Sequence, residues 1–203
     1  MDDLITLGAA TLGESGGLPM APRIRAAWVG ARLVGPAYTV SCAPGDNLAI
    51  HVAVAQAPAG SVLVVGASQI PERGYWGEVL TTGAEARGIA GLVIEGGVRD
   101  VAALESHGFP VFSTVIALRG ATKFGPGSVG RTVRVGDVDV ETSDWIVGDA
   151  DGVTVVPGAQ LEAVLSAGRA RASKEEGFFA ALRGGQTTID LLDLDRSRIE
   201  GAQ

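Results

Sequence analysis

Two charged residues of opposite sign, Arg99 and Asp100, follow a predicted buried strand and a pair of glycines in the stretch GLVIEGGVRD, residues 91–100. Ligand sites in open α/β structures gather at the carboxyl ends of strands. A guanidinium there can hold a carboxylate through two parallel hydrogen bonds. Arg99 could equally be a surface cation, and Asp100 is first of all a predicted N-cap for the helix that follows. A carboxylate has two oxygens, so capping does not exclude a second role as a metal ligand.

A second candidate is the predicted helix start at Gly77-Glu78-Val79-Leu80. The first N–H groups of a helix lack partners inside the helix and lie at the positive end of its dipole, so they bind carboxylates and phosphates. The alternative is that Glu78 only stabilises the helix, because an acidic residue is favourable at a helix N-terminus. The residues alone therefore offer an anion-binding helix start and an Arg–Asp pair.

Several other chemistries lack support. The chain has no G-x-G-x-x-G, P-loop or G-x-S-x-G motif. Cys42 is the only cysteine, which excludes an internal disulfide framework and a multi-cysteine zinc site. Its place in a predicted β segment disfavours a cysteine nucleophile. The two histidines, His51 and His107, are too few for a histidine-rich metal site, and His51 is expected at the edge of the core.

Composition limits the class of protein and its partners. The 203 residues, 46% hydrophobic and 19% charged, predict one domain over 1–203 with a sizeable core. A net charge of −7 argues against nucleic acid or an anionic membrane as partner, but leaves small anionic substrates open. The chain has no apolar run of about 18 residues and no signal-peptide pattern at its start. We therefore expect a cytoplasmic protein.

The elements that must position these residues alternate between strand and helix in the first half of the chain. The second half is mostly β, followed by one long helix. This pattern predicts a single α/β domain with mixed sheets. In the helix at 76–88, small residues at helical spacing predict the packing face: Val79, Gly83, Ala86 and Ala90. We predict strands at 31–42, 60–67, 91–95 and 110–115, a hairpin at 131–142 turning at Gly136-Asp137, two strands within 144–157, and further helices at 47–57, 101–108 and 158–182.

Three stretches together resemble the RraA-like family: PGDNLAIHVAVAQAPAGSVLVV, GYWGEVLTTGAEARGIAGLVIEGGVRD and VGDADGVTVVP. The most specific part is G-E-x-L followed by G-G-x-R-D, with Arg99 22 residues after Gly77. The resemblance covers roughly residues 30–180. The family includes 4-hydroxy-4-methyl-2-oxoglutarate (4-carboxy-4-hydroxy-2-oxoadipate) aldolases and the regulator of ribonuclease E activity. It implies a compact α/β/β swivelling-type domain that forms a homotrimer or a hexamer, with sites between subunits.

For the site, the resemblance implies a class II pyruvate aldolase that uses a divalent metal, Mg²⁺ or Mn²⁺. The backbone amides of Gly77–Leu80 would hold the carboxylate of a keto acid, and Arg99 would bind the keto acid and stabilise its enolate. Asp100 would coordinate the metal, and Glu78 would help through a bound water. The family also uses a glutamate from the neighbouring subunit's last helix.

Spacing favours Glu175 for this glutamate, with Glu176 as the fallback. By itself the stretch Lys174-Glu175-Glu176 is typical of a solvated helical face. Cleavage of a C–C bond next to a ketone leaves an enolate, which positive charge at the oxyanion stabilises. Because oxaloacetate decarboxylation leaves the same pyruvate enolate, we expect that activity too.

Two alternatives remain at this point. The first is a non-catalytic, protein-binding regulator of the ribonuclease E type, which the carboxylate of Asp100 directly after the arginine disfavours. The second keeps the site but gives it an unrelated substrate. The loop GASQIPERGY at 66–75 departs from the family pattern, with Pro71, Glu72 and Arg73 near the expected mouth of the site. This change could alter substrate choice.

Overall fold

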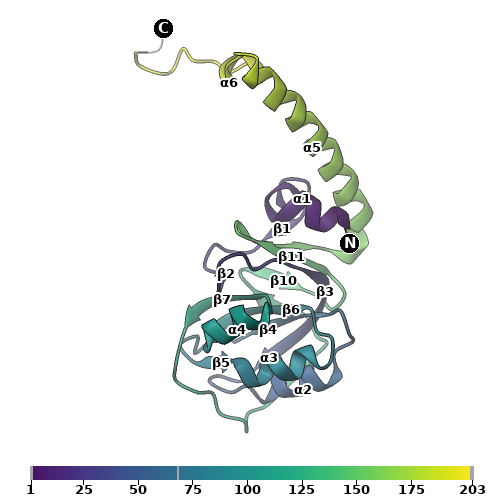
Figure 1. Cartoon of the computed structure of the whole chain (residues 1–203), viewed down its shortest axis with the longest axis vertical. Helices are drawn as coiled ribbons and strands as arrows, with labels where there is room; N and C mark the ends of the chain where they lie inside the picture. The colour runs from purple at the N-terminus through teal and green to yellow at the C-terminus, as the bar shows by residue number, and fades with distance from the viewer. Residues whose placement is uncertain (1, 68, 202–203) are drawn as a thin grey trace.

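The computed structural model of the chain describes residues 2–67 and 69–201. The fold is built on one mixed sheet of ten strands, with a separate two-stranded hairpin (Figure 1). The main path of the sheet is β1 (Leu18–Pro19), β12 (Gly152–Val156), β11 (Trp145–Asp149), β3 (Leu33–Cys42), β4 (Val62–Gly66), β6 (Gly91–Val98), β7 (Val111–Ile116) and β2 (Arg25–Ala26). Off this path, β5 (Gly74–Trp76) pairs with β6, and β8 (Gly127–Val129) pairs with β3. The expected α/β fold class with mixed strand directions is confirmed.

The centre of the sheet is parallel, because β3, β4, β6 and β7 run in the same direction. All eight residues of β6 are buried, as expected of a central strand covered on both faces. The carboxyl ends of these four strands therefore reach the same edge of the sheet, and the chain leaves β6 there at Arg99.

Three helices cover one face of the parallel strands: α2 (Leu48–Gln56), α3 (Glu78–Glu85) and α4 (Val101–His107) (Figure 1). The predicted packing face of α3 is wrong. Val79 is 82% exposed, and the helix ends before Ala86 and Ala90. The buried side chains are instead Leu80, Thr81 and Ala84. Leu80 and Ala84 lie one turn apart on the same face of the helix. The side chain that packs on the sheet is therefore a leucine, which is larger than the small residues of the predicted face.

The hairpin of β9 (Val133–Val135) and β10 (Val138–Val140) covers the opposite face. Its turn at Gly136 and Asp137 has positive φ at both residues, 56° and 65°, as a two-residue type I′ turn requires. The predicted hairpin is therefore confirmed. Glu95, buried within β6, fastens this hairpin to the sheet by accepting hydrogen bonds from Gly136 N and from Arg23 Nε, both 2.8 Å long.

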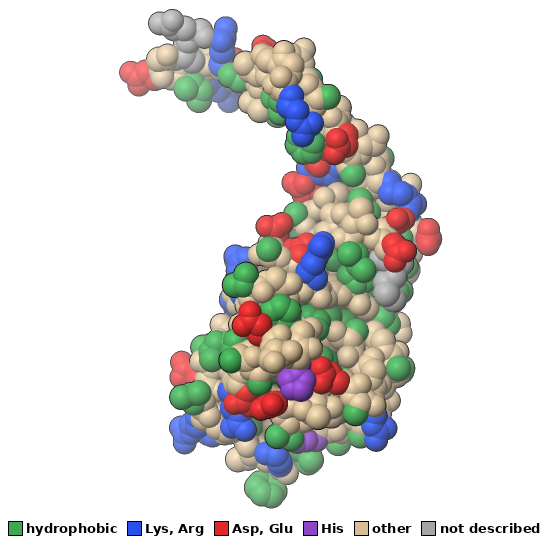
Figure 2. Space-filling model, in the orientation of Figure 1, with side chains coloured by type: hydrophobic (Ala, Val, Ile, Leu, Met, Phe, Trp, Pro, Cys, Tyr) green, Lys and Arg blue, Asp and Glu red, His purple; other side chains and the backbone are tan. Residues whose placement is uncertain are grey.

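The N-terminal helix packs against β11 and β12 and against the last long helix. Helix α1 (Asp2–Gly13) contacts the first half of α5 (Leu161–Arg183), which follows a short 3-10 turn, η1 (Gly158–Gln160). The second half of α5 projects from the body and ends in α6 (Thr188–Leu192), as Figures 1 and 2 show. The long helix is confirmed, whereas α6 and the short strands β1, β2, β5 and β8 were not predicted. None of the helices among the described residues is long and apolar enough to span a membrane.

Candidate active site

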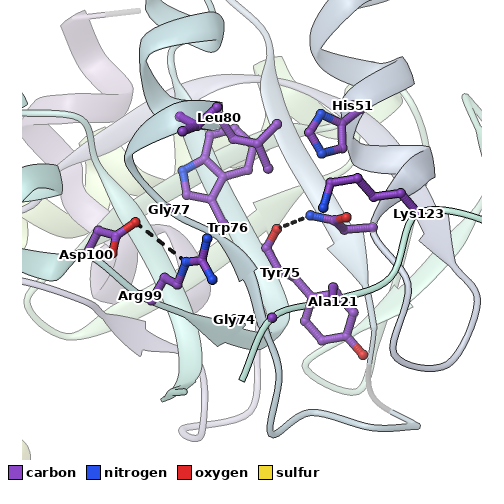
Figure 3. A pocket seen from close by; sticks show the side chains of 13 residues that line it. His51, Gly74, Tyr75, Trp76, Gly77, Leu80, Arg99, Asp100, Ala121 and Lys123 are labelled. Atoms are coloured by element: carbon purple, nitrogen blue, oxygen red, sulfur yellow. Dashed lines mark hydrogen bonds and ion pairs between the residues drawn. The ribbon is translucent and has the colours of Figure 1, made fainter. Parts of the chain in front are cut away.

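A cavity of about 210 Å³ opens at the carboxyl edge of the parallel strands. Its walls come from four segments: the end of β6, the turn from β5 into α3, the start of α2, and the loop between β7 and β8. Figure 3 shows Arg99 and Asp100 on one side of the cavity and His51 and Lys123 on the other. The topology therefore unites the two motifs that the sequence singled out, and it adds residues that the motifs do not contain.

The carboxylate of Asp100 does not cap its own helix. Asp100 occupies the N-cap position of α4 in the left-handed conformation (φ 56°, ψ 37°) and makes no side-chain cap hydrogen bond there. Its Oδ2 instead accepts a hydrogen bond from Glu78 N, 3.1 Å away, at the start of α3. The predicted cap of α4 is therefore wrong. Left-handed backbone is tolerated best by glycine, asparagine and aspartate, and here it turns the carboxylate toward the neighbouring helix.

Gly77 allows this contact because it has no side chain. A Cβ atom at this position would lie 2.3 Å from Asp100 Oδ2 and 3.1 Å from Arg99 Cγ. Arg99 Nε lies 3.6 Å from Asp100 Oδ2, and both side chains are a little more than 40% exposed (43% and 42%). The two charged groups thus face the cavity side by side, with the guanidinium beyond hydrogen-bond distance of the carboxylate.

The start of α3 offers backbone N–H groups to an anion in the cavity. The N–H of Glu78 already donates to Asp100. The next two residues, Val79 and Leu80, line the cavity. Their N–H groups belong to the first helical turn, which has no intrahelical acceptors for them. The Glu78 side chain points elsewhere: its Oε1 lies 3.7 Å from Nε2 of His107, on α4. Glu78 is not among the residues that line the cavity, so any part in the chemistry requires its side chain to turn.

The opposite wall contains three polar side chains that the motifs did not reveal: Asn47, His51 and Lys123. Asn47 is 5% exposed, and its Nδ2 donates to Tyr75 O at 2.8 Å. Two buried atoms, Asn47 Oδ1 and His51 Nε2, have no hydrogen-bond partner within the part of the chain that the structure describes. Burial, and then the charge of Lys123, lower the pKa of His51, which favours its neutral imidazole. His51 therefore belongs to the cavity wall and not only to the edge of the core.

One signal in the sequence could have revealed this wall. Asn47 and His51 are four residues apart at the start of a helix, directly after a strand and the turn at 44–47. That spacing places both side chains on one face of the helix, near a strand end. Lys123 had no such signal, because it lies in a loop.

The single cysteine takes no part in this site. Cys42 is half-buried, and burial, followed by the nearby charge of Asp46, raises the pKa of its thiol to about 12. A thiol in this state is a poor nucleophile and a poor metal ligand, in keeping with the sequence-based interpretation.

The chain does not bring Glu175 to its own cavity. Glu175 lies on the projecting helix α5, where its Oε1 forms an ion pair with Arg171 Nε, 2.9 Å away. Its contribution to a neighbouring subunit's site therefore stays a prediction, as does the choice between Glu175 and Glu176.

The residues of the cavity can hold a divalent metal through one carboxylate, and the other ligands would have to come from water and substrate. Among residues 2–67 and 69–201, no group of three or more His, Cys, Asp or Glu side chains could hold a metal ion. Of the residues that the structure describes, Asp100 is the one with a carboxylate that lines the cavity. Mg²⁺ commonly binds through one or two carboxylates and completes its shell with water and substrate oxygens, so the donor set is compatible with it.

Charge and hydrogen-bonding groups are divided across the cavity. Arg99 lies on one wall and Lys123 on the other, with the side chains of Asn47 and His51 on the side of Lys123. Two cations at opposite ends suit a ligand with two anionic groups, and an unpartnered acceptor suits a hydroxyl donor. This arrangement can bind and orient a small hydroxylated diacid.

Comparison with known proteins identifies the family of the chain. The family model RraA-like, described as Aldolase/RraA, matches residues 8–155. A Halalkalibacterium halodurans protein, provisionally named as a 4-hydroxy-4-methyl-2-oxoglutarate aldolase, is 38% identical over 145 residues, 71% of this chain and 69% of that protein.

Two solved structures have the same fold over most of their length. A Pseudomonas syringae pv. tomato protein superimposes with a TM-score of 0.78 at 26% identity, covering 92% of this chain and 95% of the other. Streptomyces coelicolor RraAS2, described as an unusual member of the RNase ES inhibitor RraA family, superimposes with a TM-score of 0.76 at 25% identity, covering 90% and 96%. The chain belongs to the RraA-like (Aldolase/RraA) family.

Proposed function

We propose that the protein is a divalent-metal-dependent pyruvate aldolase. It would cleave a 4-hydroxy-2-oxo diacid, such as 4-hydroxy-4-methyl-2-oxoglutarate, and also decarboxylate oxaloacetate. The observation that carries the proposal is the cavity itself. It joins Arg99 and Asp100 to the first turn of α3 on one wall and sets Lys123 against them on the other.

The walls suggest how such a diacid binds. The carboxylate next to the ketone would lie at the N–H groups of Val79 and Leu80, within reach of Arg99. The distal carboxylate would pair with Lys123, and the C4 hydroxyl would donate to the unpartnered Asn47 Oδ1 or His51 Nε2. Each end of the substrate then meets a group of the complementary charge or hydrogen-bonding type.

In the cleavage step, the C4 hydroxyl would give its proton to a water in the cavity acting as the base, and would become a carbonyl while the C3–C4 bond breaks. The electron pair of that bond forms the pyruvate enolate, whose negative charge is on the C2 oxygen. Arg99 stabilises this oxyanion, because a fixed cation next to developing charge needs no reorganisation. Protonation at C3 then gives pyruvate. Oxaloacetate leads to the same enolate by releasing CO₂.

A bound Mg²⁺ or Mn²⁺ would supply Lewis-acid stabilisation of the keto oxygen, with Asp100 as its carboxylate ligand from this chain. The contact between Asp100 Oδ2 and Glu78 N orients that carboxylate toward the cavity. Orienting contacts of this kind are a common support for metal ligands.

The proposal includes a homotrimer or hexamer in which a neighbouring α5 brings Glu175 to the cavity. Two observations support it. The second half of α5 projects from the body, as Figure 1 shows. Large apolar side chains are exposed near the cavity, among them Val79 at 82%, Leu118 at 83% and Phe124 at 91%.

The second candidate is a protein-binding regulator, which the likeness to Streptomyces coelicolor RraAS2 favours. A regulator does not need the buried, unpartnered Asn47 Oδ1 and His51 Nε2, because leaving such atoms without a partner costs stability. Their presence in a cavity with Arg99 and Asp100 is better explained by a small polar ligand.

The test is pyruvate release from oxaloacetate and from 4-hydroxy-4-methyl-2-oxoglutarate, with Mg²⁺ and with EDTA. We expect release that EDTA abolishes. Arg99→Ala should lower kcat by about 100-fold or more, the usual effect of losing one oxyanion donor. Arg119→Ala, an exposed arginine of the same region, should stay near the wild-type rate. Failure of the wild-type protein to release metal-dependent pyruvate from either substrate would contradict the proposal.

A further inference from the structure

The loop between β7 and β8 brings Lys123 and Ala121 to the cavity, although the segment at 117–126 contains no helix or strand. Backbone hydrogen bonds hold it along its length. Gly74 N donates to Arg119 O (2.8 Å), Thr122 N to Gly45 O (2.9 Å), and Asn47 N to Thr122 O (2.9 Å). The loop is therefore fastened to the β5 strand at one end and to the start of α2 at the other.

A single buried carboxylate, Asp46, completes this attachment. Asp46 is 3% exposed. Its Oδ1 accepts from Leu48 N, at the start of α2, at 2.9 Å. Its Oδ2 accepts from the Thr122 hydroxyl at 2.8 Å and from Phe124 N at 2.6 Å. One oxygen thus serves the helix and the other serves the loop.

The placement of these bonds matters because Thr122 and Phe124 flank Lys123. Asp46 holds the side chain of Thr122 on one side of Lys123 and the backbone N–H of Phe124 on the other. It directly precedes Asn47 in the chain, one turn before His51. Hydrogen bonds to a carboxylate are about twice as strong as those between neutral groups. They also account for the acidity of Asp46: burial alone would raise its pKa, but the bonds from Leu48, Gly125, Phe124 and Thr122 lower it to about 2.

We propose that Asp46 is a positioning residue that sets the distance between Lys123 and the Asn47–His51 wall, and so determines the preference for substrates with a second carboxylate. This inference rests on the proposed function, because it assumes that Lys123 pairs with the distal carboxylate. Asp46 itself does not line the cavity, so its effect reaches the substrate only through the groups it holds.

The experiment compares two reactions of one enzyme. Oxaloacetate decarboxylation uses a substrate with a distal carboxylate, whereas deuterium exchange into the methyl group of pyruvate uses one without. In Asp46→Asn, the side chain keeps only one oxygen, so one of the two elements loses its acceptor. We expect KM for oxaloacetate to rise about tenfold, which corresponds to one lost interaction of ordinary strength. KM for pyruvate and both kcat values should stay within about twofold.

Two further variants separate positioning from a loss of stability. Thr122→Val removes only a donor on the loop side and should shift the same KM ratio in the same direction, by a smaller factor. Asp144→Asn is the matched control: Asp144 also joins two segments, accepting from Glu141 N at 2.9 Å and Gly158 N at 3.0 Å, and it does not line the cavity. It should lower thermal stability without changing the ratio.

Equal changes of KM in both reactions, no change in either, or the same change of ratio in Asp144→Asn would overturn the proposal. If wild-type protein catalyses neither reaction, the proposed function fails. The positioning role of Asp46 is then tested by measuring amide hydrogen exchange in the loop. The Phe124 amide should then exchange faster in Asp46→Asn and Thr122→Val than in wild type or Asp144→Asn. An unchanged rate there would overturn the positioning role independently of catalysis.

Discussion

Asp100 combines an unusual backbone conformation with a carboxylate that one main-chain N–H orients. A non-glycine residue in left-handed backbone costs of the order of 1 kcal/mol or more, and such residues occur often at functional sites. Here the left-handed backbone lets Asp100 Oδ2 accept a hydrogen bond from Glu78 N, so that the start of α4 is joined to the start of α3. Only part of the carboxylate is used by this bond, so the group can also serve a cation.

Substituting Asp100 by asparagine separates these two roles. Asparagine also tolerates left-handed backbone, and its side-chain oxygen can accept from Glu78 N, but it is a weaker ligand for a hard cation. We expect Asp100→Asn to keep the thermal midpoint within a few degrees and to lose metal-dependent pyruvate release. Thermal unfolding and steady-state kinetics on the same preparation check this. Loss of activity together with a large drop in the midpoint would assign Asp100 a structural role instead.

At the scale of elements, the turn from β5 into α3 must pass close to the end of β6. Gly77 makes this possible, since a Cβ there would overlap Asp100 Oδ2 at 2.3 Å. Helix α3 also contains Gly83, whose Cβ would lie 3.6 Å from Val54 Cγ1, an ordinary contact. The same substitution should therefore have opposite consequences at the two glycines.

Gly77→Ala should displace the Asp100 carboxylate and lower kcat by about tenfold or more, the effect of a misplaced catalytic group. Gly83→Ala should leave kcat unchanged and raise the free energy of unfolding by up to about 1 kcal/mol, because alanine favours the helix. Kinetics and urea unfolding of both variants test this. If Gly77→Ala is as active as Gly83→Ala, the close approach of Asp100 to α3 is not needed for activity.

The anchoring of α2 by Asp46 should give stability a defined pH dependence. The folded-state pKa of Asp46 is lowered from 3.8 to about 2. A lowered carboxyl pKa stabilises the fold fully above the unfolded value, and the contribution is lost as pH falls toward the folded value. The stability difference between wild type and Asp46→Asn should therefore be constant above about pH 5 and shrink below pH 4. Urea unfolding across this range measures it, and a constant difference down to the lowest pH would contradict the assignment.

At the scale of the whole molecule, the projecting half of α5 is the least self-contained part of the structure. It has exposed apolar side chains, including Phe179 at 44% exposed, and little of the body beneath it, as Figure 2 shows. A helix of this kind gains most of its stability by packing against another surface. A second copy of the chain is the partner that the proposed function requires.

If α5 completes a neighbouring site, Glu175→Gln should lower kcat strongly without changing the oligomer, and Glu176→Gln should act as a nearly silent control. Specific activity should also fall on dilution, at the concentrations where light scattering detects dissociation. Should both variants and dilution leave activity unchanged, each chain would carry a complete site, and the role of Glu175 would be wrong. A strong effect of Glu176→Gln alone would identify Glu176 as the contributing residue.

The sequence by itself determined the features that depend on local pattern. Apolar runs of strand length predicted the parallel strands, Gly136-Asp137 predicted the hairpin turn, and the local motifs identified Gly77–Leu80 and Arg99-Asp100 as two separate candidates, which only the family resemblance joined into one site. These features are encoded by residues close together in the chain, where propensity and periodicity are strongest.

Only the tertiary structure decided the contacts between distant segments. Asp100 caps α3 and not α4 because β6 ends beside the start of α3, a proximity that no local pattern contains. Lys123 reaches the cavity because Asp46, far away in the chain, holds its loop. The packing face of α3 likewise followed from where the helix begins relative to β5. Long-range proximity is set by how the strands are ordered in the sheet, and that order emerges only when the whole core is packed.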